Sequence, residues 1–346
     1  MSERKLIILT EGHSNPHTAK TGCSVIRYRR EEVVGVLDAT LAGQNVEEYL
    51  GVGEGFKFIS RIDEAAQANC LLIGIAPPGG KIPEHWRPVI LQAISRGMTV
   101  LSGLHEFLSE DEEFSAAAVA AGTELVDVRK NSETDVANRI GLRSDCLRIL
   151  TVGQDCCVGK MVTSIELTRD LIAKQHQAEF VATGQTGILI AGNGCPVDCV
   201  VSDFISGAVE KQILAAQNHD ILCIEGQGSL AHPRYSAVTL GLLHGSVPHG
   251  MVLCYEAGRK AIHGMPEIGL TDLATLKDAY ESAARLMMPS QVIGIAMNSR
   301  LLSAEQAEEE RKRIREQFQL PVCDVFRHGP DELTAAVLEL KQQIQG

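Results

Sequence analysis

The chain has 346 residues, of which 45% are hydrophobic and 22% charged, and this length favours two domains over one. Its formal net charge of −12 disfavours nucleic acid and anionic membrane surfaces as partners, because both bind cationic protein surfaces. No apolar run approaches the roughly 20 residues of a membrane-spanning helix, and the opening MSERKLIILTEGHS has no signal-peptide pattern. We therefore expect a cytoplasmic protein whose ten cysteines are reduced.

Short apolar segments alternate with helical patterns over the first 140 or so residues. The strand-like segments are 5–9, 33–38, 56–60, 70–76, 98–102 and 124–128. This alternation is typical of a parallel sheet with helices on both faces, in which ligands bind beyond the carboxyl ends of the strands. The pattern predicts a Rossmann-like N-terminal domain over residues 1–140.

A second series of strand-like segments follows a polar stretch at 129–145, which is read as a helix or a linker and contains the domain boundary. These segments are 146–153, 179–190, 220–228, 250–257, 291–299 and 320–326. Helical patterns lie between them, so the same argument predicts a second α/β domain over residues 141–346.

The segment TVGQDCCVGKMVTS, at 151–164, is close to a phosphate-binding loop. The usual spacing is a Gly, four residues, then Gly-Lys and a hydroxyl residue. It follows an apolar strand and opens an amphipathic helix, whose N-terminal N–H groups attract anions. The segment therefore predicts a P-loop domain, with the cofactor contacts Gly153, Asp155, Val158, Gly159, Lys160, Met161 and Thr163.

Two departures from the usual spacing bear on the ligand. Five residues separate Gly153 from Gly159, as in the GTDxxVGKT loop of dethiobiotin synthetase, which this loop resembles. Met161 replaces the hydroxyl that normally ligates Mg²⁺ beside the β- and γ-phosphates. A loop of this kind can hold a diphosphate but is poorly equipped for metal-assisted hydrolysis. The residues alone permit both ATP and an acyl-coenzyme A.

Polar residues follow several other strands of this domain. Glu225, in IEGQG, ends a strand much like the Glu-Gly-Ala-Gly strand of dethiobiotin synthetase, and could ligate Mg²⁺ if that metal is used. Asp203 is a second acidic candidate for the metal and could equally cap the next helix. Asn298, just past a late strand, is a candidate for an adenine contact or a turn residue.

Seven segments together resemble one family over nearly the whole chain. They are ILTEGHSNPHTAKTG (8–22), IGIAPPGGKIPEHWR (73–87), SGLHEFL (102–108), GQDCCVGKMVTSIEL (153–167), VDCVVSDFISGAVE (197–210), IEGQGSLAHP (224–233) and VPHGMVLCYEAGR (247–259). They resemble the D-glutamate N-acetyltransferase-like family, long catalogued as a domain of unknown function. The resemblance implies a Rossmann-like domain followed by a P-loop domain. It also implies acetyl transfer from acetyl-CoA to the amino group of D-glutamate, in D-amino acid metabolism.

One departure from the family pattern concerns the residues after the loop lysine. The family commonly shows Gly-Lys, then Met or Lys, then Thr-Thr. Here Val162 replaces the first of those threonines, so Thr163 remains to supply a hydroxyl.

Acetyl transfer needs a base for the ammonium group and donors for the thioester oxyanion. The candidate catalytic residues are His232, Glu225 and Asp203. The dicarboxylate substrate requires cationic partners, and the candidates are Arg234, Arg259 and Lys20.

Two other functions remain open on the residues alone. One is an ATP- and Mg²⁺-dependent ligase or kinase acting on a carboxylate, as in dethiobiotin synthetase. The other is a non-catalytic nucleotide-binding protein, which Met161 also permits. The apolar C-terminal run and the moderate size favour a homo-oligomer.

Overall fold

A computed structural model describes residues 3–77 and 79–345. The chain forms two compact units, one through Asn131 together with Ile188–Gly192, the other from Ser132 onward without that segment. The division falls earlier than the expected boundary at residue 140. The reason is that the buried carboxylate of Glu210, in the second unit, accepts the backbone N–H groups of Asn138 and Arg139.

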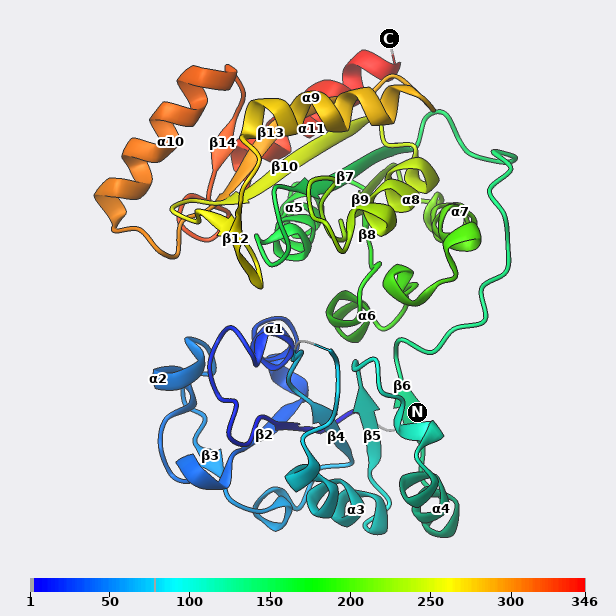
Figure 1. Cartoon of the computed structure of the whole chain (residues 1–346), viewed down its shortest axis with the longest axis vertical. Coiled ribbons are helices and arrows are strands. Elements are labelled where there is room, and N and C mark those ends of the chain that lie inside the picture. Colours follow the sequence, from blue (N-terminus) through cyan, green and yellow to red (C-terminus); the bar gives the residue numbers. More distant parts are fainter. Residues whose placement is uncertain (1–2, 78, 346) are drawn as a thin grey trace. The chain divides into compact units, whose positions relative to one another are not determined.

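The first unit is built on a six-stranded parallel sheet in the order β3-β2-β1-β4-β5-β6 (Figure 1). Its strands are β1 (Leu6–Leu9), β2 (Val33–Leu37), β3 (Phe58–Ile59), β4 (Cys70–Ile73), β5 (Thr99–Ser102) and β6 (Leu125–Asp127). Its helices are α1 (Lys20–Tyr28), α2 (Val46–Leu50), α3 (Arg87–Ser95) and α4 (Glu112–Ala121). The strand order reverses at β1, which is the doubly wound arrangement of Rossmann-like domains. The predicted fold class of this domain is confirmed.

The second unit contains another six-stranded parallel sheet, in the order β14-β13-β10-β7-β9-β8. Its strands are β7 (Leu147–Gly153), β8 (Ala178–Val181), β9 (Ile221–Ile224), β10 (Gly250–Glu256), β13 (Gln291–Asn298) and β14 (Val322–Cys323). A small antiparallel pair, β11 (Ala261–Ile262) and β12 (Met265–Gly269), follows β10. The helices are α5 (Lys160–Ala173), α7 (Ile205–Ala216), α8 (Ser236–Ser246), α9 (Leu273–Arg285), α10 (Ala304–Phe318) and α11 (Asp331–Gln345). The helix α6 (Gln185–Ala191) begins in this unit, and its residues from Ile188 onward group with the first unit.

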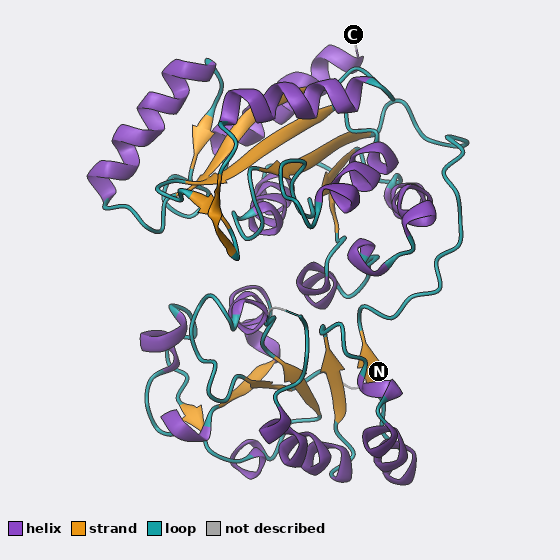
Figure 2. Ribbon diagram, in the orientation of Figure 1, coloured by secondary structure: helices purple, strands orange, loops and turns teal. Residues whose placement is uncertain are grey.

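Helices cover both faces of this second sheet, as Figure 2 shows. Met251 and Leu253 of β10 pack in one apolar cluster with residues of α7, α8 and α9. Val252 and Cys254, which alternate with them along the strand, pack in another cluster with residues of α5 and α11. Alternate residues of a strand face opposite sides of the sheet, so both sides must be apolar in a buried parallel strand. This explains the continuous apolar run GMVLCY.

One segment differs from the sequence-based prediction, and a second agrees with one of the two alternatives given for it. Residues 179–190 were expected to form one strand, but β8 ends at Val181 and the apolar run GILI lies in α6. The strand cannot continue because the N–H groups of Thr183 and Gly184 bind the carboxylate of Glu225 instead of a neighbouring strand. The polar stretch 129–145 contains neither a helix nor a strand.

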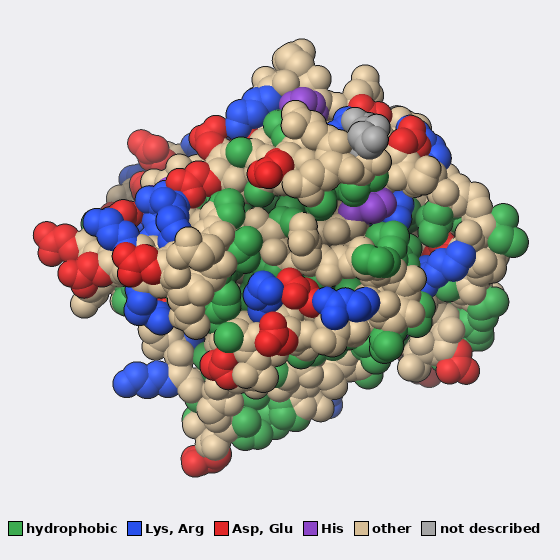
Figure 3. Space-filling view, turned by 90° about the horizontal axis from the view of Figure 1, so that it is seen from above, with side chains coloured by type: hydrophobic (Ala, Val, Ile, Leu, Met, Phe, Trp, Pro, Cys, Tyr) green, Lys and Arg blue, Asp and Glu red, His purple; other side chains and the backbone are tan. Residues whose placement is uncertain are grey.

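None of the helices formed by the described residues combines the length and apolar character that crossing a bilayer requires. Figure 3, which views the molecule from above, shows Lys and Arg side chains interspersed with Asp and Glu on that face.

Candidate functional site

The site centres on the loop between β7 and α5. Gly159, the N-cap residue of α5, adopts a left-handed conformation with φ of 107°, and no side chain caps this helix terminus. The first N–H groups of a helix have no acceptor within it, so this terminus keeps donors available for an anion. A Cβ atom at Gly153 would lie 2.9 Å from Nζ of Lys160, so any other residue at this position would displace the lysine side chain.

The side chain of Lys160 folds back onto the loop that precedes α5. This side chain is buried, and Nζ donates a hydrogen bond to the backbone oxygen of Asp155 at 2.8 Å. The ammonium group therefore lies beside the N-terminus of α5, where it can bind the same anion as the backbone N–H groups.

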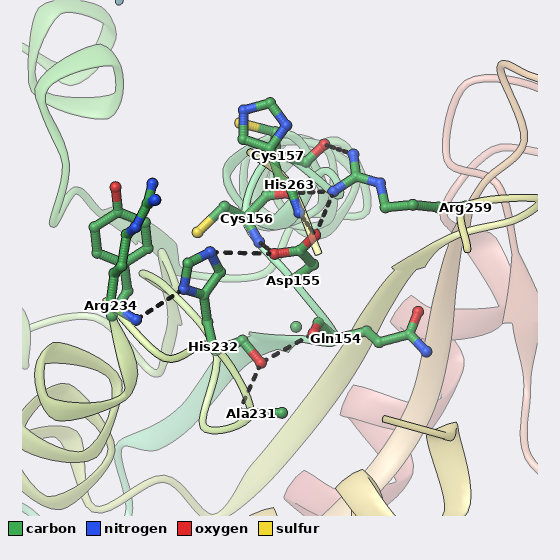
Figure 4. A network of polar contacts seen from close by, with 12 residues as sticks. Gln154, Asp155, Cys156, Cys157, Ala231, His232, Arg234, Arg259 and His263 are labelled. Atoms are coloured by element: carbon green, nitrogen blue, oxygen red, sulfur yellow. Dashed lines mark hydrogen bonds and ion pairs between the residues drawn. The ribbon is translucent and has the colours of Figure 1, made fainter. Parts of the chain in front are cut away.

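A buried ion-pair network supports the same loop (Figure 4). The carboxylate of Asp155 is fully buried and accepts hydrogen bonds from Nη1 of Arg259 at 2.8 Å and from the N–H of His263 at 2.7 Å. Arg259 also pairs with Glu256, at 2.5 Å, and donates to the backbone oxygen of Cys156. Burial opposes the charge of Arg259, but the two carboxylates raise the pKa of its guanidinium on balance. Arg259 therefore braces the loop, and its prediction as a substrate-carboxylate clamp finds no support in these contacts.

His232 comes from the segment between β9 and α8, and its side chain is 1% exposed. Its Nδ1 accepts the backbone N–H of Arg234 at 3.1 Å. A protonated Nδ1 could not accept this bond, so the neutral ring carries its hydrogen on Nε2. Nε2 lies 3.8 Å from Oδ1 of Asp155 and has no hydrogen-bond partner among the described residues. Acting as a base would therefore require the bond to Arg234 to break first, which argues against the predicted role of His232 as a catalytic base.

Asp155, Cys156 and His232 also place one potential metal-ligand atom each within 4.8 Å of one another. Carboxylate, thiolate and imidazole are ligand types that Zn²⁺ accepts. A metal at Nε2 needs the lone pair of that nitrogen, which requires the hydrogen on Nδ1. Because Nδ1 already accepts an N–H, the cluster does not fit a metal ion in this arrangement.

Glu225 lies at the end of β9, where the sequence predicted it, and is almost fully buried. Its Oε2 accepts the N–H groups of Thr183 at 2.9 Å and Gly184 at 3.1 Å. Burial raises the pKa of this carboxyl to about 7, and the two N–H donors limit the rise. Glu225 therefore exchanges a proton near neutral pH, which suits a general base better than a permanently charged Mg²⁺ ligand.

Three loop residues have roles that differ from simple phosphate contacts. Thr163 was expected to supply the missing hydroxyl, but its Oγ1 lies 3.8 Å from Sγ of Cys254 in the interior. The cause is helical geometry, since a residue three positions after Lys160 returns to the face packed on the sheet. Val158 is buried in the apolar cluster beneath α5, and Met161 is half-buried.

The other predicted residues are Asp203, Asn298, Arg234 and Lys20. Asp203 is exposed in the turn Ser202–Phe204, and no hydrogen bond or ion pair joins it to the network of described residues. Asn298 accepts the N–H of Arg300 at 3.2 Å, which is a local turn contact. Arg234 is exposed, and Lys20 begins α1 in the first unit.

Sequence reasoning missed the residues that hold the strand ends together. Oγ1 of Thr151 accepts the N–H of Gly226 at 3.0 Å and contacts the hydroxyl of Ser164 at 3.0 Å. The hydroxyl of Tyr280, from α9, donates to the oxygen of Gly153 at 2.9 Å and accepts the N–H of Leu230 at 3.2 Å. The glycines of IEGQG indicated a close approach of two backbone segments, but no sequence pattern indicated the role of Tyr280.

The fold and the loop define a class: a two-domain α/β protein with a Rossmann-like unit and a P-loop unit. Comparison with known proteins agrees. The model of a Rossmann-like domain of unknown function, DUF1611_N, matches residues 39–131, and that of the P-loop domain DUF1611_C matches residues 132–334. The chain belongs to the DUF1611 family.

Relatives and a solved structure support this assignment over most of the chain. A D-glutamate N-acetyltransferase of Tritonibacter scottomollicae is 37% identical over 92% of this chain and 94% of its own length. A protein of the same name from a Pseudoalteromonas species is 40% identical over 79% of this chain and 83% of its own length. The crystal structure of a DUF1611 family protein from Anabaena variabilis superposes with a TM-score of 0.91 at 35% identity, covering 97% of this chain and 99% of that one.

Proposed function

We propose that the protein transfers the acetyl group of acetyl-CoA to the amino group of D-glutamate. The observation that carries this proposal is the pair of relatives named D-glutamate N-acetyltransferase, at 37% and 40% identity over most of this chain. The names of these relatives support an acetyltransferase. We further propose acetyl-CoA as the acetyl donor and D-glutamate as the acceptor.

We assign the N-terminus of α5 to the diphosphate of acetyl-CoA. The N-cap residue of the helix is Gly159, which has no side chain to cap it, and Lys160 supplies a charge beside it. Met161 offers no hydroxyl to a metal, and Glu225 is buried with its Oε2 bonded to two N–H groups. A diphosphate that stays intact during the reaction does not need metal-assisted cleavage, so these features favour a coenzyme A ester over ATP.

Glu225 is the base that this site offers for the substrate ammonium. Its carboxyl has a pKa of about 7, raised by burial, so the ionised form is available near neutral pH. An ammonium that transfers one proton to Glu225 leaves a neutral amine, which attacks the carbonyl carbon of the thioester. The C–S bond then breaks, and the nitrogen loses its second proton to the coenzyme A thiolate, which leaves as the thiol.

Calorimetric titration of the purified protein tests the assignment of the loop. We expect acetyl-CoA to bind without Mg²⁺ and the binding to fall at least about tenfold in Lys160→Ala, which loses a charge-assisted contact. Lys174→Ala is the matched control, because Lys174 follows the other end of α5 and pairs with Asp170 and Asp331 at the surface.

An acetylation assay with D-glutamate, and with L-glutamate for comparison, tests the reaction. Formation of the N-acetyl product and free coenzyme A from D-glutamate is the expected result. Binding of ATP that requires Mg²⁺, with no acetyl transfer, would replace this proposal with the ligase or kinase. Tight nucleotide binding without any product would favour a binding protein.

A further inference from the structure

The ten cysteines of the chain are thiols rather than disulfides, and they differ in their surroundings. Burial raises the pKa of seven of these thiols: Cys23, Cys70, Cys146, Cys195, Cys223, Cys254 and Cys323. Such thiols stay protonated at neutral pH and are poor nucleophiles. The other three are partly exposed: Cys156 and Cys157 in the P-loop and Cys199 in the turn Val197–Cys199.

Cys156 is distinguished from the other two by its neighbour His232. Its Sγ lies within 4.8 Å of the ligand atoms of both Asp155 and His232, and Figure 4 shows it beside the imidazole ring. The N–H of Nε2 is buried, and no hydrogen-bond acceptor for it occurs among residues 3–77 and 79–345. A buried donor without an acceptor is costly, so a negative group next to it would be stabilised.

The ring of His232 is held so that it keeps presenting this donor. Nδ1 accepts the N–H of Arg234, the backbone N–H of His232 donates to the oxygen of Ser229 at 3.0 Å, and the ring packs on Tyr235 with centroids 4.5 Å apart. The orientation and the tautomer are therefore set by the fold before any ligand arrives.

The charged groups around Cys156 are arranged in the same sense. Asp155 is the nearest negative charge, but its carboxylate is already paired with Arg259 at 2.8 Å and hydrogen-bonded by the N–H groups of Cys156 and His263. The positive end of the α5 dipole lies beyond the loop, and Arg259 donates to the backbone oxygen of Cys156 itself. A thiolate at Cys156 would therefore lie near the N–H donor of His232 and near a carboxylate whose charge is already paired with Arg259.

We propose that Cys156 is a reactive thiol and a site of modification by low-molecular-weight disulfides, with the Nε2–H of His232 stabilising its thiolate. The thiolate, formed by loss of its proton to solvent, attacks one sulfur of a disulfide RSSR. A bond forms between Sγ of Cys156 and that sulfur, the S–S bond breaks, and the other half leaves as a thiolate RS⁻. No further oxidant is needed, because the disulfide itself is reduced.

The adduct has a consequence for the loop, which rests on the proposed function. A bulky group on Cys156 would lie beside the N-terminus of α5, where we place the diphosphate of acetyl-CoA. Modification should therefore block the coenzyme, and bound coenzyme should protect the thiol. Cys156 would then couple activity to the disulfide content of the surroundings.

Oxidised glutathione is a suitable probe, with peptide mapping by mass spectrometry to locate each adduct on the folded protein. We expect Cys156 to be modified first, with Cys157 and Cys199 slower by about tenfold or more. Cys156→Ser should abolish the fast adduct, whereas Cys199→Ser should leave it unchanged. Acetyl-CoA at saturating concentration should slow the reaction of Cys156.

Two variants of His232 test whether its donor is the cause. His232→Gln can place an amide N–H near the position of Nε2, whereas His232→Leu cannot donate. We expect the leucine variant to react about tenfold more slowly, as for loss of one hydrogen bond to a charged group, and the glutamine variant to recover part of the rate. Thermal unfolding of both variants shows whether they remain folded.

Reaction of Cys156 no faster than that of Cys199 would overturn the inference, as would equal rates in the wild type and in His232→Leu. These outcomes leave the acetyltransferase assay untouched. Conversely, a fast adduct in a protein that neither binds acetyl-CoA nor acetylates D-glutamate would retain the reactive thiol and reject the proposed function.

Discussion

Arg259 and Asp155 form a buried ion pair, with Nη1 of the arginine 2.8 Å from Oδ2 of the aspartate, although 104 residues separate them in the chain. The aspartate belongs to the P-loop, and the arginine follows β10, the strand next to β7. The pair therefore connects the loop that follows β7 to the segment that follows β10, the adjacent strand.

Replacing the arginine of this pair should destabilise the protein strongly. Arg259→Leu leaves the carboxylates of Asp155 and Glu256 buried with less compensation, and breaking a buried pair from one side costs about 3–5 kcal/mol. Urea denaturation measures the loss. The exposed Arg313–Glu310 pair on α10 is the control, for which Arg313→Leu should cost at most about 1 kcal/mol. Equal effects of the two replacements would show that burial does not set the value of the pair.

Gly226 should not tolerate any side chain. A Cβ atom there would lie 1.7 Å from the backbone oxygen of Thr151, a contact that only movement of β7 or β9 could relieve. We expect Gly226→Ala to lower the free energy of unfolding by about 3 kcal/mol or more and to weaken binding at the loop. Gly269→Ala, where a Cβ atom meets nothing within 4 Å, is the matched control and should fold normally. A stable, fully active Gly226→Ala protein would contradict the close approach of the two strands.

The hydroxyl of Tyr280 should contribute to stability through its hydrogen bonds to Gly153 and Leu230. Tyr280→Phe keeps the buried ring but leaves the oxygen of Gly153 and the N–H of Leu230 without this partner. The expected loss of stability is about 1–2 kcal/mol, measured by denaturant titration. The structural role predicts a change in ligand affinity smaller than that of Lys160→Ala, and the reverse order would indicate direct contact with the ligand.

Stability should depend on pH through Glu225. Its pKa is raised from 4.5 in the unfolded chain to about 7 in the folded protein, so the folded state binds more protons between these values. The contribution is fully present below pH 4.5 and is lost as the pH rises through 7. Glu225→Gln, which stays neutral, should therefore gain stability relative to the wild type between pH 5 and 8, by on the order of 3 kcal/mol. Denaturation curves at both pH values check this, and an unchanged difference would place the carboxyl pKa near its normal value.

The elements with a strong local signal were predictable. The runs KLIIL, CLLIGIA and GMVLCY each contain a buried strand, because a parallel sheet covered on both faces needs continuous apolar residues. The loop from Gly153 to Lys160 was also predictable, since its glycines and lysine are adjacent in sequence and act through backbone geometry. Glu225 was found at the end of its strand for the same reason.

Tertiary structure alone decided what surrounds these residues. Whether Arg259 clamps a substrate or braces Asp155 depends on the order of strands in the sheet, which pairs β10 with β7. The GILI run reads as a strand locally but becomes part of α6, because the preceding backbone N–H groups bind Glu225. The tautomer of His232 follows from one backbone N–H, and the contact of Thr163 with Cys254 follows from helical rotation onto the core. A sequence pattern indicates which side of a segment is buried. The partner of a polar group depends instead on which strands lie next to each other, and that arrangement exists only in the folded chain.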